Sequence, residues 1–231
     1  MTAKRALTAS TNQFSQLTPI RNQRLVISPI KVDRDCGIIN SRPSNAAIEI
    51  EARHRLEPLQ QCQLDGLCGV LSAQNALRLA LADHAPITLA KSKKLFASAI
   101  DYLCRKRTLD STMITGMGLH RRLAITRHLA KQASTTNYQV VVERPDHTGW
   151  TTIDDVFEWI DQSLTLGRPV LVWLDGSINH FSVIAGSDRT RLLLFDSAGL
   201  TFVFKRSCGL RHGCHQLRPQ GLFRVAVYPS G

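Results

Sequence analysis

A cysteine, a histidine and an aspartate of this chain have the types and the order that nucleophilic chemistry by a thiol requires. They are Cys68, His180 and Asp196. Sulfur attacks a carbonyl group as a thiolate, and a neighbouring imidazole promotes that ionisation. A carboxylate that accepts a hydrogen bond from the imidazole fixes its orientation and stabilises its protonated form. The three residues therefore predict acyl transfer, with Cys68 as nucleophile, His180 as general base and Asp196 as the orienting residue.

The segment around Cys68 predicts the start of a helix at residues 68–81, which are rich in aliphatic residues at helical spacing. The positive end of a helix dipole lowers the pKa of a thiol placed there. Gly66 permits a tight turn into the helix, and Gly69 leaves the backbone beside the sulfur uncrowded. The Cys68 N–H and the side-chain amide of Gln63 are the expected donors to an oxyanion.

The segments around His180 and Asp196 predict two neighbouring strands. His180 begins the aliphatic run 180–187, and Asp196 stands near the end of the run 191–197. A hairpin that turns near residues 188–190 places the start of the first strand beside the end of the second. That arrangement brings the carboxylate to the imidazole. Trp173, seven residues before His180, is a candidate for the wall of the same cleft.

The remaining segments predict an α+β domain. Helices are expected at 89–107, 119–133 and 152–167, and strands at 138–143, 169–175, 200–206 and 222–229. The chain thus places most helices before most strands. This order is typical of a domain in which helices pack against an antiparallel sheet. Residues 1–55, rich in Ser, Thr, Asn, Arg and Pro, are expected to form a polar, flexible arm, and residues 56–231 the catalytic domain.

Two stretches of the sequence resemble the papain-like cysteine protease superfamily. QLDGLCGVLSAQNAL resembles Josephin-like deubiquitinases, in which a Gln precedes the Cys by five residues. GRPVLVWLDGSINHFSVIAGSD and the following RLLLFDSAG resemble bacterial double-glycine leader peptidases, in which a Pro-started strand leads to the His. The resemblance covers about residues 60–205. It implies a papain-like fold, with a helical lobe packed against an antiparallel β-sheet.

The resemblance also implies that Gln63 is the oxyanion donor, but the sequence departs from papain itself at this point. Papain has its glutamine six residues before the cysteine, where this chain has Cys62, so Gln61 is an alternative to Gln63. The aromatic residue that usually follows the catalytic cysteine is replaced by Gly69. A Cys-His-Asp triad needs no metal or organic cofactor, and none is expected.

The expected reaction is hydrolysis of an amide, isopeptide or thioester bond in a protein or peptide. Protease, deubiquitinase, amidase and acyltransferase activities remain open. A bacterial protease or effector is expected, located in the cytoplasm or secreted without a cleavable signal, because no apolar stretch follows the basic N-terminus. No run of about 20 apolar residues that would span a membrane occurs.

The chain is strongly basic, with a net charge of +11 over 231 residues. Such a charge favours acidic partners: an acidic polypeptide first, and nucleic acid as the less favoured choice. The cationic residues between positions 91 and 131 are Lys91, Lys93, Lys94, Arg105, Lys106, Arg107, Arg121, Arg122, Arg127 and Lys131. They are expected to lie on solvated helix faces. The alternative function is accordingly a non-catalytic binding module that docks an acidic protein or nucleic acid through this region.

Six cysteines are present, and without an export signal their thiols are expected to be reduced. Cys208, His212, Cys214 and His215 form a C-x3-H-x-C-H pattern whose side chains are all zinc-compatible. Its spacing matches no standard zinc knuckle. A structural metal at this pattern and a simple basic loop are both open.

Overall fold

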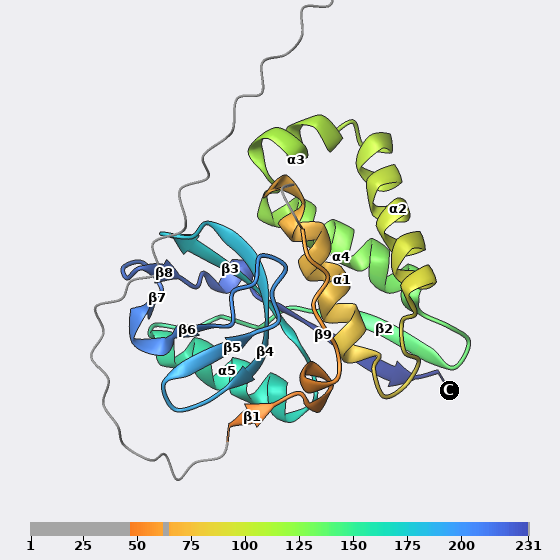
Figure 1. The fold of residues 1–231 in the computed structure, drawn as a ribbon. Coiled ribbons are helices and arrows are strands. Elements are labelled where there is room, and N and C mark those ends of the chain that lie inside the picture. The colour runs from red at the N-terminus through yellow and green to blue at the C-terminus, as the bar shows by residue number, and fades with distance from the viewer. Residues whose placement is uncertain (1–46, 62–64, 231) are drawn as a thin grey trace, which may run out of the picture. The chain divides into compact units, whose positions relative to one another are not determined.

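A computed structural model describes residues 47–61 and 65–230 of the chain, and these residues form a mixed α+β unit (Figure 1). The described helices are α1 (Cys68–Ala80), α2 (Leu89–Arg105), α3 (Leu109–Thr115), α4 (Leu119–Ala133) and α5 (Ile153–Thr165). The main strands are β2 (Tyr138–Glu143), β3 (Val170–Gly176), β4 (His180–Ser187), β5 (Arg191–Leu194), β6 (Phe202–Phe204) and β9 (Phe223–Pro229). Shorter strands are β1 (Ile48–Glu49), β7 (Cys208–Gly209) and β8 (His215–Gln216). The α+β class predicted from the sequence is confirmed.

The described strands form one nine-stranded sheet with the main order β2-β9-β3-β4-β5-β6. Its pairs are antiparallel except the short pair β7–β8. Strands β3 to β6 follow one another in the chain and in space, as expected for successive hairpins. The last strand, β9, returns between β2 and β3, an insertion that the sequence pattern did not predict.

The N-terminal boundary of the globular unit differs from the one expected at residue 55. Strand β1 pairs with β4, with Ile48 opposite Ser187, and Ile50 and Ala52 are buried. Residues 47–55 therefore belong to the folded unit, because they complete the sheet and cover part of the core. The rest of the expected arm, residues 1–46, lies outside the described residues.

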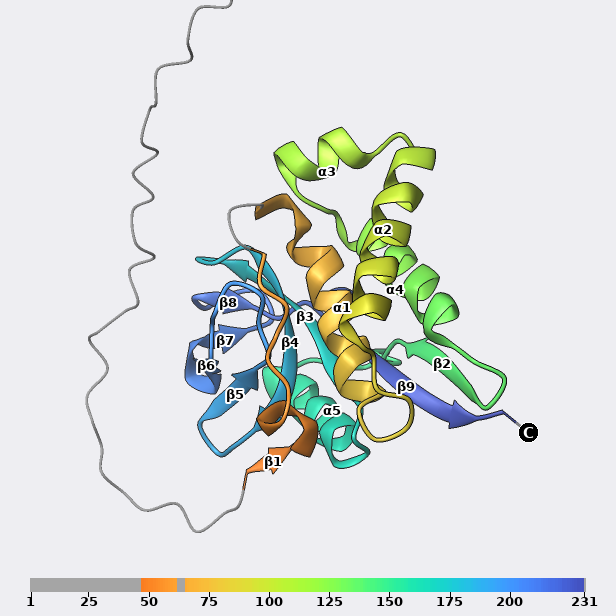
Figure 2. The same ribbon diagram turned by 45° about the vertical axis from the view of Figure 1, so that its right-hand side comes forward.

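Helix α1 is the centre of the helical layer. It contacts α2 and α4 as well as β3, β4 and β9, and Figures 1 and 2 show it between those helices and the sheet. All of its residues except Arg78 are buried, which fits a helix whose sequence is apolar on more than one side. α1 therefore gives any residue at its N-terminus a fixed position against the sheet.

Helix α5 contacts β1, β3 and β4, and its start is held by a capping box at Thr152. The Thr152 hydroxyl accepts a hydrogen bond from the Asp155 N–H, while an Asp155 carboxylate oxygen accepts one from the Thr152 N–H. All eight residues of β4 are buried, so both faces of this strand are covered. None of the described helices is both long and apolar enough to cross a lipid bilayer.

Candidate active site

Cys68 is the first residue of α1, and its side chain lies in the interior with 7% of the residue exposed. The preceding residue, Leu67, offers no side-chain cap, and no acidic residue stands in the first turn. The first N–H groups of a helix have no partner inside the helix. The thiol therefore lies at the positive end of α1, next to backbone donors that can serve an oxyanion.

His180 is the first residue of β4, and its Nε2 lies 2.8 Å from Oδ2 of Asp196. The two residues are 7% and 2% exposed. The register explains the contact: Ile184 faces Leu194, so the same register continued by two residues places Asp196 opposite Ser182, diagonal to His180. The hairpin predicted from the sequence is present, closed by the Asp188 N–H to the Arg191 carbonyl.

Asp196 is fixed through both carboxylate oxygens. Oδ2 faces His180, and Oδ1 accepts hydrogen bonds from the N–H groups of Ala198 at 2.7 Å and Leu200 at 3.2 Å. The turn that supplies these donors contains Gly199 at φ +84°, a conformation that glycine adopts without strain. Because the carboxylate cannot turn away, it fixes the orientation of the imidazole.

The thiol and the imidazole shift each other's protonation. Burial by itself would raise the pKa of Cys68, but hydrogen bonds from the His180 side chain and the Phe181 N–H outweigh it and lower the pKa. Burial would lower the pKa of His180, but hydrogen bonds to Asp196 and Cys68 raise it to about 9. The pKa of Asp196 is lowered despite burial, chiefly by its bond to His180. Near neutral pH this arrangement favours a thiolate beside an imidazolium.

The segment before α1 makes hydrogen bonds both to α1 and to the turn that follows Asp196. The Asn75 side chain of α1 makes two hydrogen bonds with the backbone of Leu59. Two residues later, the Gln61 N–H donates to the Ser197 carbonyl, and the Gln61 amide oxygen accepts from the Ser197 hydroxyl at 3.0 Å. This connection joins the helix that carries Cys68 to the turn that follows Asp196.

The expected oxyanion donor Gln63 lies outside the described residues, together with Cys62. The alternative, Gln61, is described, and its amide oxygen is engaged by Ser197. Of the four residues predicted to perform the chemistry, Cys68, His180 and Asp196 are therefore brought together, and the position of Gln63 stays a prediction.

A cavity of about 240 Å³ opens beside Cys68. Its described lining comes from the start of α1 and the turn before it, the end of α3, the α3–α4 connection and the β3–β4 hairpin: Gly66, Cys68, Met113, Ile114, Thr115, Gly116, Met117, Trp173, Asn179 and Phe181. Trp173 donates from its indole Nε1 to Asn179 at 3.0 Å, so it forms part of the cleft wall as expected. No charged side chain is among these described lining residues. The cavity therefore suits an uncharged part of a ligand.

Gly66 has a different role from the one predicted. It does not have a positive φ, so the turn alone does not require glycine. Instead, a Cβ at this position would lie 2.3 Å from the Thr112 carbonyl oxygen and 2.7 Å from that of Met113. Glycine is needed because the backbone of α3 approaches the start of α1 very closely.

We expect Gly66→Ala to separate α3 from α1, to destabilise the fold by about 1–3 kcal/mol and to reduce the reactivity of Cys68, because the added methyl group meets backbone that cannot rotate away. Denaturant unfolding and alkylation of Cys68 measure the two effects. Gly118→Ala is the matched control, since its added Cβ meets nothing within 4 Å and its φ is −74°. Equal stability and reactivity of the two variants would contradict this role of Gly66.

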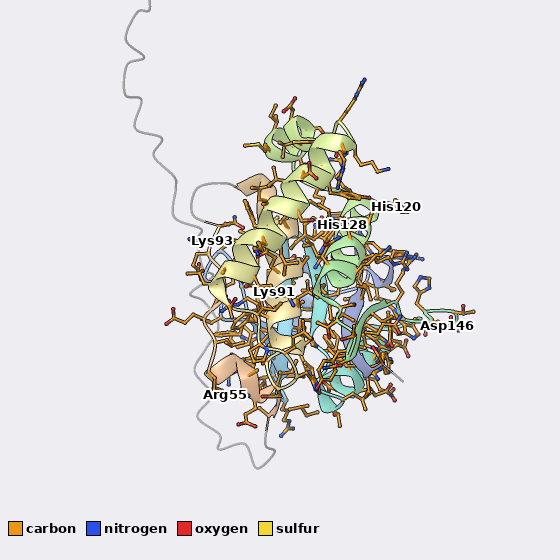
Figure 3. All side chains as sticks on the ribbon, turned by 90° about the vertical axis from the view of Figure 1, so that its right-hand side faces the viewer. Arg55, Lys91, Lys93, His120, His128 and Asp146 are labelled. Carbon is orange, nitrogen blue, oxygen red and sulfur yellow. The ribbon has the colours of Figure 1, made fainter. Side chains whose placement is uncertain are left out.

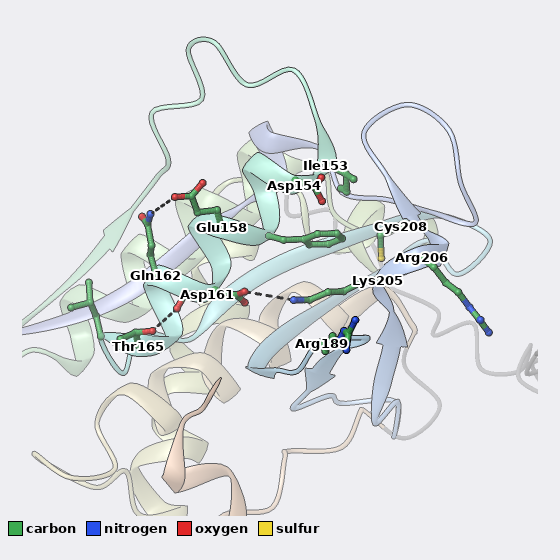
Figure 4. Close-up of a pocket in the computed structure, with 12 residues that line it drawn as sticks. Ile153, Asp154, Glu158, Asp161, Gln162, Thr165, Arg189, Lys205, Arg206 and Cys208 are labelled. Carbon is green, nitrogen blue, oxygen red and sulfur yellow. Dashed lines mark hydrogen bonds and ion pairs between the residues drawn. The ribbon is translucent and has the colours of Figure 1, made fainter. Parts of the chain in front are cut away.

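A larger cavity, of about 1170 Å³, lies between α5 on one side and the β4–β5 turn and the segment 205–208 after β6 on the other (Figure 4). Its lining includes the ion pair between Lys205 Nζ and Asp161 Oδ2 at 3.6 Å. Its one thiol, Cys208, is buried, and burial raises the pKa of Cys208 to about 12. The Cys208 thiol therefore stays protonated near neutral pH and is not a nucleophile. None of the triad residues lines this cavity.

The residues of the C-x3-H-x-C-H pattern are not gathered around one point. The Cys208 thiol donates to the Phe204 carbonyl, Cys214 is exposed, and His215 Nδ1 lies 3.3 Å from the Ser177 hydroxyl. Among the described residues, no group of three His, Cys, Asp or Glu side chains is placed to hold a metal ion. The four described cysteines, Cys68, Cys104, Cys208 and Cys214, are free thiols.

The basic region is mostly solvated, as predicted, with one exception. Figure 3 looks onto α2 and α4, with Lys91 and Lys93 on the first and His120 and His128 on the second. Lys91 donates to the Ala133 carbonyl at 3.4 Å, and Lys93 is exposed. Arg122, which the sequence placed among these surface charges, is instead 0% exposed. The expectation of a solvated side chain is wrong for this residue.

The chain matches no protein-family model and no curated protein.

Two buried polar residues near the site were not predicted from the sequence to have a structural role. They are Asn75, which makes hydrogen bonds to the backbone of Leu59, and Arg122. A signal for Arg122 was present, because it lies three residues before Ile125 and seven before Leu129, on the buried stripe of α4.

Proposed function

We propose that this protein is a cysteine hydrolase of papain-like architecture that cleaves an amide, isopeptide or thioester bond in a protein or peptide. One observation carries the proposal: a thiol with a lowered pKa at the start of a buried helix meets an imidazole whose other side is held by a buried carboxylate. Each of these features lowers the barrier to acyl transfer by a thiol. The order of helix and strands that supply them supports the papain-like assignment.

The proposed reaction follows from the positions of the groups. The Cys68 thiolate attacks the carbonyl carbon, while the negative oxygen is stabilised by N–H groups at the start of α1. The bond to the leaving group then breaks, and the leaving group takes the proton of the His180 imidazolium. Neutral His180 next removes a proton from water, whose hydroxide attacks the thioester. The carbon–sulfur bond breaks, and thiolate and imidazolium are restored.

Asp196 keeps the imidazole in place throughout these steps. Its contact with Nε2 leaves Nδ1 as the ring nitrogen available to the sulfur and the leaving group. The cavity beside Cys68 accommodates the part of the substrate next to the bond that is cleaved. Its volume of about 240 Å³ and the absence of charged side chains among its described lining residues suit a small, uncharged group of a protein or peptide.

Trapping of the acyl intermediate tests the proposal with controls inside the same molecule. The protein is mixed with p-nitrophenyl acetate, quenched in acid within seconds and digested, and the acetylated cysteine is identified by mass spectrometry. We expect the acetyl group on Cys68 and not on Cys104 or Cys214, which are exposed free thiols. Acetylation of the two exposed cysteines with Cys68 unmodified would refute the proposal, because exposure would then outweigh activation.

A further inference from the structure

Arg122 is the largest side chain that the described core buries completely. It projects from α4 between two aromatic rings, with its guanidinium carbon 4.3 Å from the centre of the Phe181 ring and 4.8 Å from that of Phe223. Charged side chains are almost never fully buried unless they are paired. The position of Arg122 therefore calls for an anionic partner.

The hydrogen bonds of Arg122 do not provide an anionic partner. Nη2 donates to the Ser182 carbonyl at 3.2 Å, while Nε and Nη1 have no hydrogen-bond partner among the described residues. No carboxylate of the described residues forms an ion pair with it, and burial lowers the pKa of Arg122 to about 9. A buried cation without an anionic partner weakens a fold, so Arg122 needs compensation from a group that is not a carboxylate.

Arg122 contacts two residues of β4, Phe181 and Ser182, that follow His180 directly in the chain. One of the two rings it stacks on belongs to Phe181, the residue whose backbone N–H helps to lower the pKa of Cys68. The carbonyl it binds belongs to Ser182, two residues after His180. Cys68 is the anionic group whose charge favours the protonated form of Arg122, and Arg122 in turn favours the ionised form of Cys68.

The charged and titratable groups around the Cys68 thiol come from the helix and the strand that pack against the start of α1. His180 faces it from β4 and Arg122 from α4, while Asp196 acts through His180. The α3–α4 connection contributes Met117, whose Sδ lies near Gly69 of α1. The thiolate therefore has two cationic neighbours, one that donates and accepts protons during turnover and one that stays charged.

We propose that Arg122 is a positioning residue of this site: a buried cation that stabilises the Cys68 thiolate and has that thiolate as its counter-ion. The inference rests on the proposed function, since it assigns Arg122 to the same nucleophile. It also bears on the second half of the reaction. When the sulfur is acylated its charge is lost, and Arg122 then favours release of the thiolate as the leaving group.

The test compares Arg122→Met with the wild-type protein and with Arg127→Met, which makes the same change at an exposed position of the same helix. The rate of iodoacetamide alkylation of Cys68 is measured against pH by peptide mass spectrometry. For Arg122→Met we expect the midpoint to move to higher pH, and the rate below the wild-type midpoint to fall about tenfold, since a nearby opposite charge shifts ionisation by at least this factor. Arg127→Met should match the wild type, and Arg122→Lys should recover part of the loss.

The thermal unfolding temperature of Arg122→Met distinguishes stabilisation of the Cys68 thiolate by Arg122 from a purely structural role of Arg122. Arg122→Met removes the cost of burying the guanidinium, and the Cys68 thiol can take up a proton, so no thiolate is left without its counter-ion. We therefore expect Arg122→Met to unfold at the wild-type temperature or above, although its thiol reacts more slowly. An unchanged pH profile for a folded Arg122→Met protein would overturn the inference while leaving Cys68 as nucleophile. An ordinary thiol profile in the wild type would instead overturn the proposed function itself.

A second measurement leaves Arg122 unsubstituted. It therefore tests the inference even if Arg122→Met and Arg122→Lys both fail to fold. In protein labelled with ¹⁵N-arginine, the Nε–H resonance of Arg122 should shift with pH as Cys68 ionises, and this shift should vanish in Cys68→Ser. Identical titration of the resonance in the two proteins would rule out the thiolate as the counter-ion of Arg122.

Discussion

His180→Ala will slow hydrolysis of p-nitrophenyl acetate by about 10²- to 10⁴-fold, the usual contribution of a positioned general acid–base group. The variant loses the group that promotes ionisation of Cys68, protonates the leaving group and activates water. The thiol then remains buried with only the Phe181 N–H and Arg122 to favour its thiolate. Steady-state turnover with Cys68→Ala as the baseline measures the loss.

His120→Ala is the control for this substitution, because His120 lies near the start of α4 and takes no part in the triad (Figure 3). It should keep wild-type turnover. If His180→Ala retained more than about a tenth of the wild-type rate, the imidazole would supply less than general acid–base catalysis usually does. The assignment of His180 as the base would then be wrong.

Asp196→Ala will reduce turnover by about 10²-fold or more, because the imidazole loses the group that fixes its orientation and stabilises its charge. The pH profile should change in a defined direction. In the wild type, the pKa of His180 is raised from 6.5 to about 9, so the imidazolium that protonates the leaving group persists until the pH passes about 9. Without the carboxylate, the alkaline limb of the profile should move from about pH 9 toward pH 6.5.

Asp196→Asn separates orientation from charge. The amide oxygen can still accept from Nε2, so this variant should lie between the wild type and Asp196→Ala in rate. Its alkaline limb should move like that of Asp196→Ala, since both lack the negative charge. An alkaline limb that stays at the wild-type pH in both variants would show that Asp196 does not support the charge on His180.

Local sequence pattern predicted most elements that position the site. The helix that begins at Cys68, the helix that follows Thr152 and the hairpin that joins β4 to β5 follow from periodicity and turn residues, which act over short distances. The contact between His180 and Asp196 was predicted from the hairpin, but it also depends on an irregularity that the sequence pattern did not reveal. Between Ile184 and Gly186 the β4–β5 register shifts by one residue, and this shift turns Asp196 to the face of the sheet that carries His180. The site is therefore most predictable where sequence neighbours are also neighbours in space.

The features that were missed depend on contacts between distant segments. Helix α3 is short, without a sustained apolar period, and packs through its backbone against Gly66. The return of β9 between β2 and β3 leaves no mark on the local alternation of residues. Arg122 was counted with the surface charges because composition does not distinguish the faces of a helix, although the periodicity of α4 does.

The pH dependence of Cys68 alkylation in the wild type and in His180→Ala tests the thiolate–imidazolium pair most directly, because it requires no knowledge of the substrate. We expect wild-type Cys68 to react with iodoacetamide well below the pH at which a free thiol ionises, about 8.5. We expect His180→Ala to move the midpoint of this profile upward and to slow the reaction at pH 6 by about tenfold or more. A wild-type Cys68 that titrates like a free thiol, or one that His180→Ala leaves unchanged, would contradict the triad and favour the alternative of a binding module.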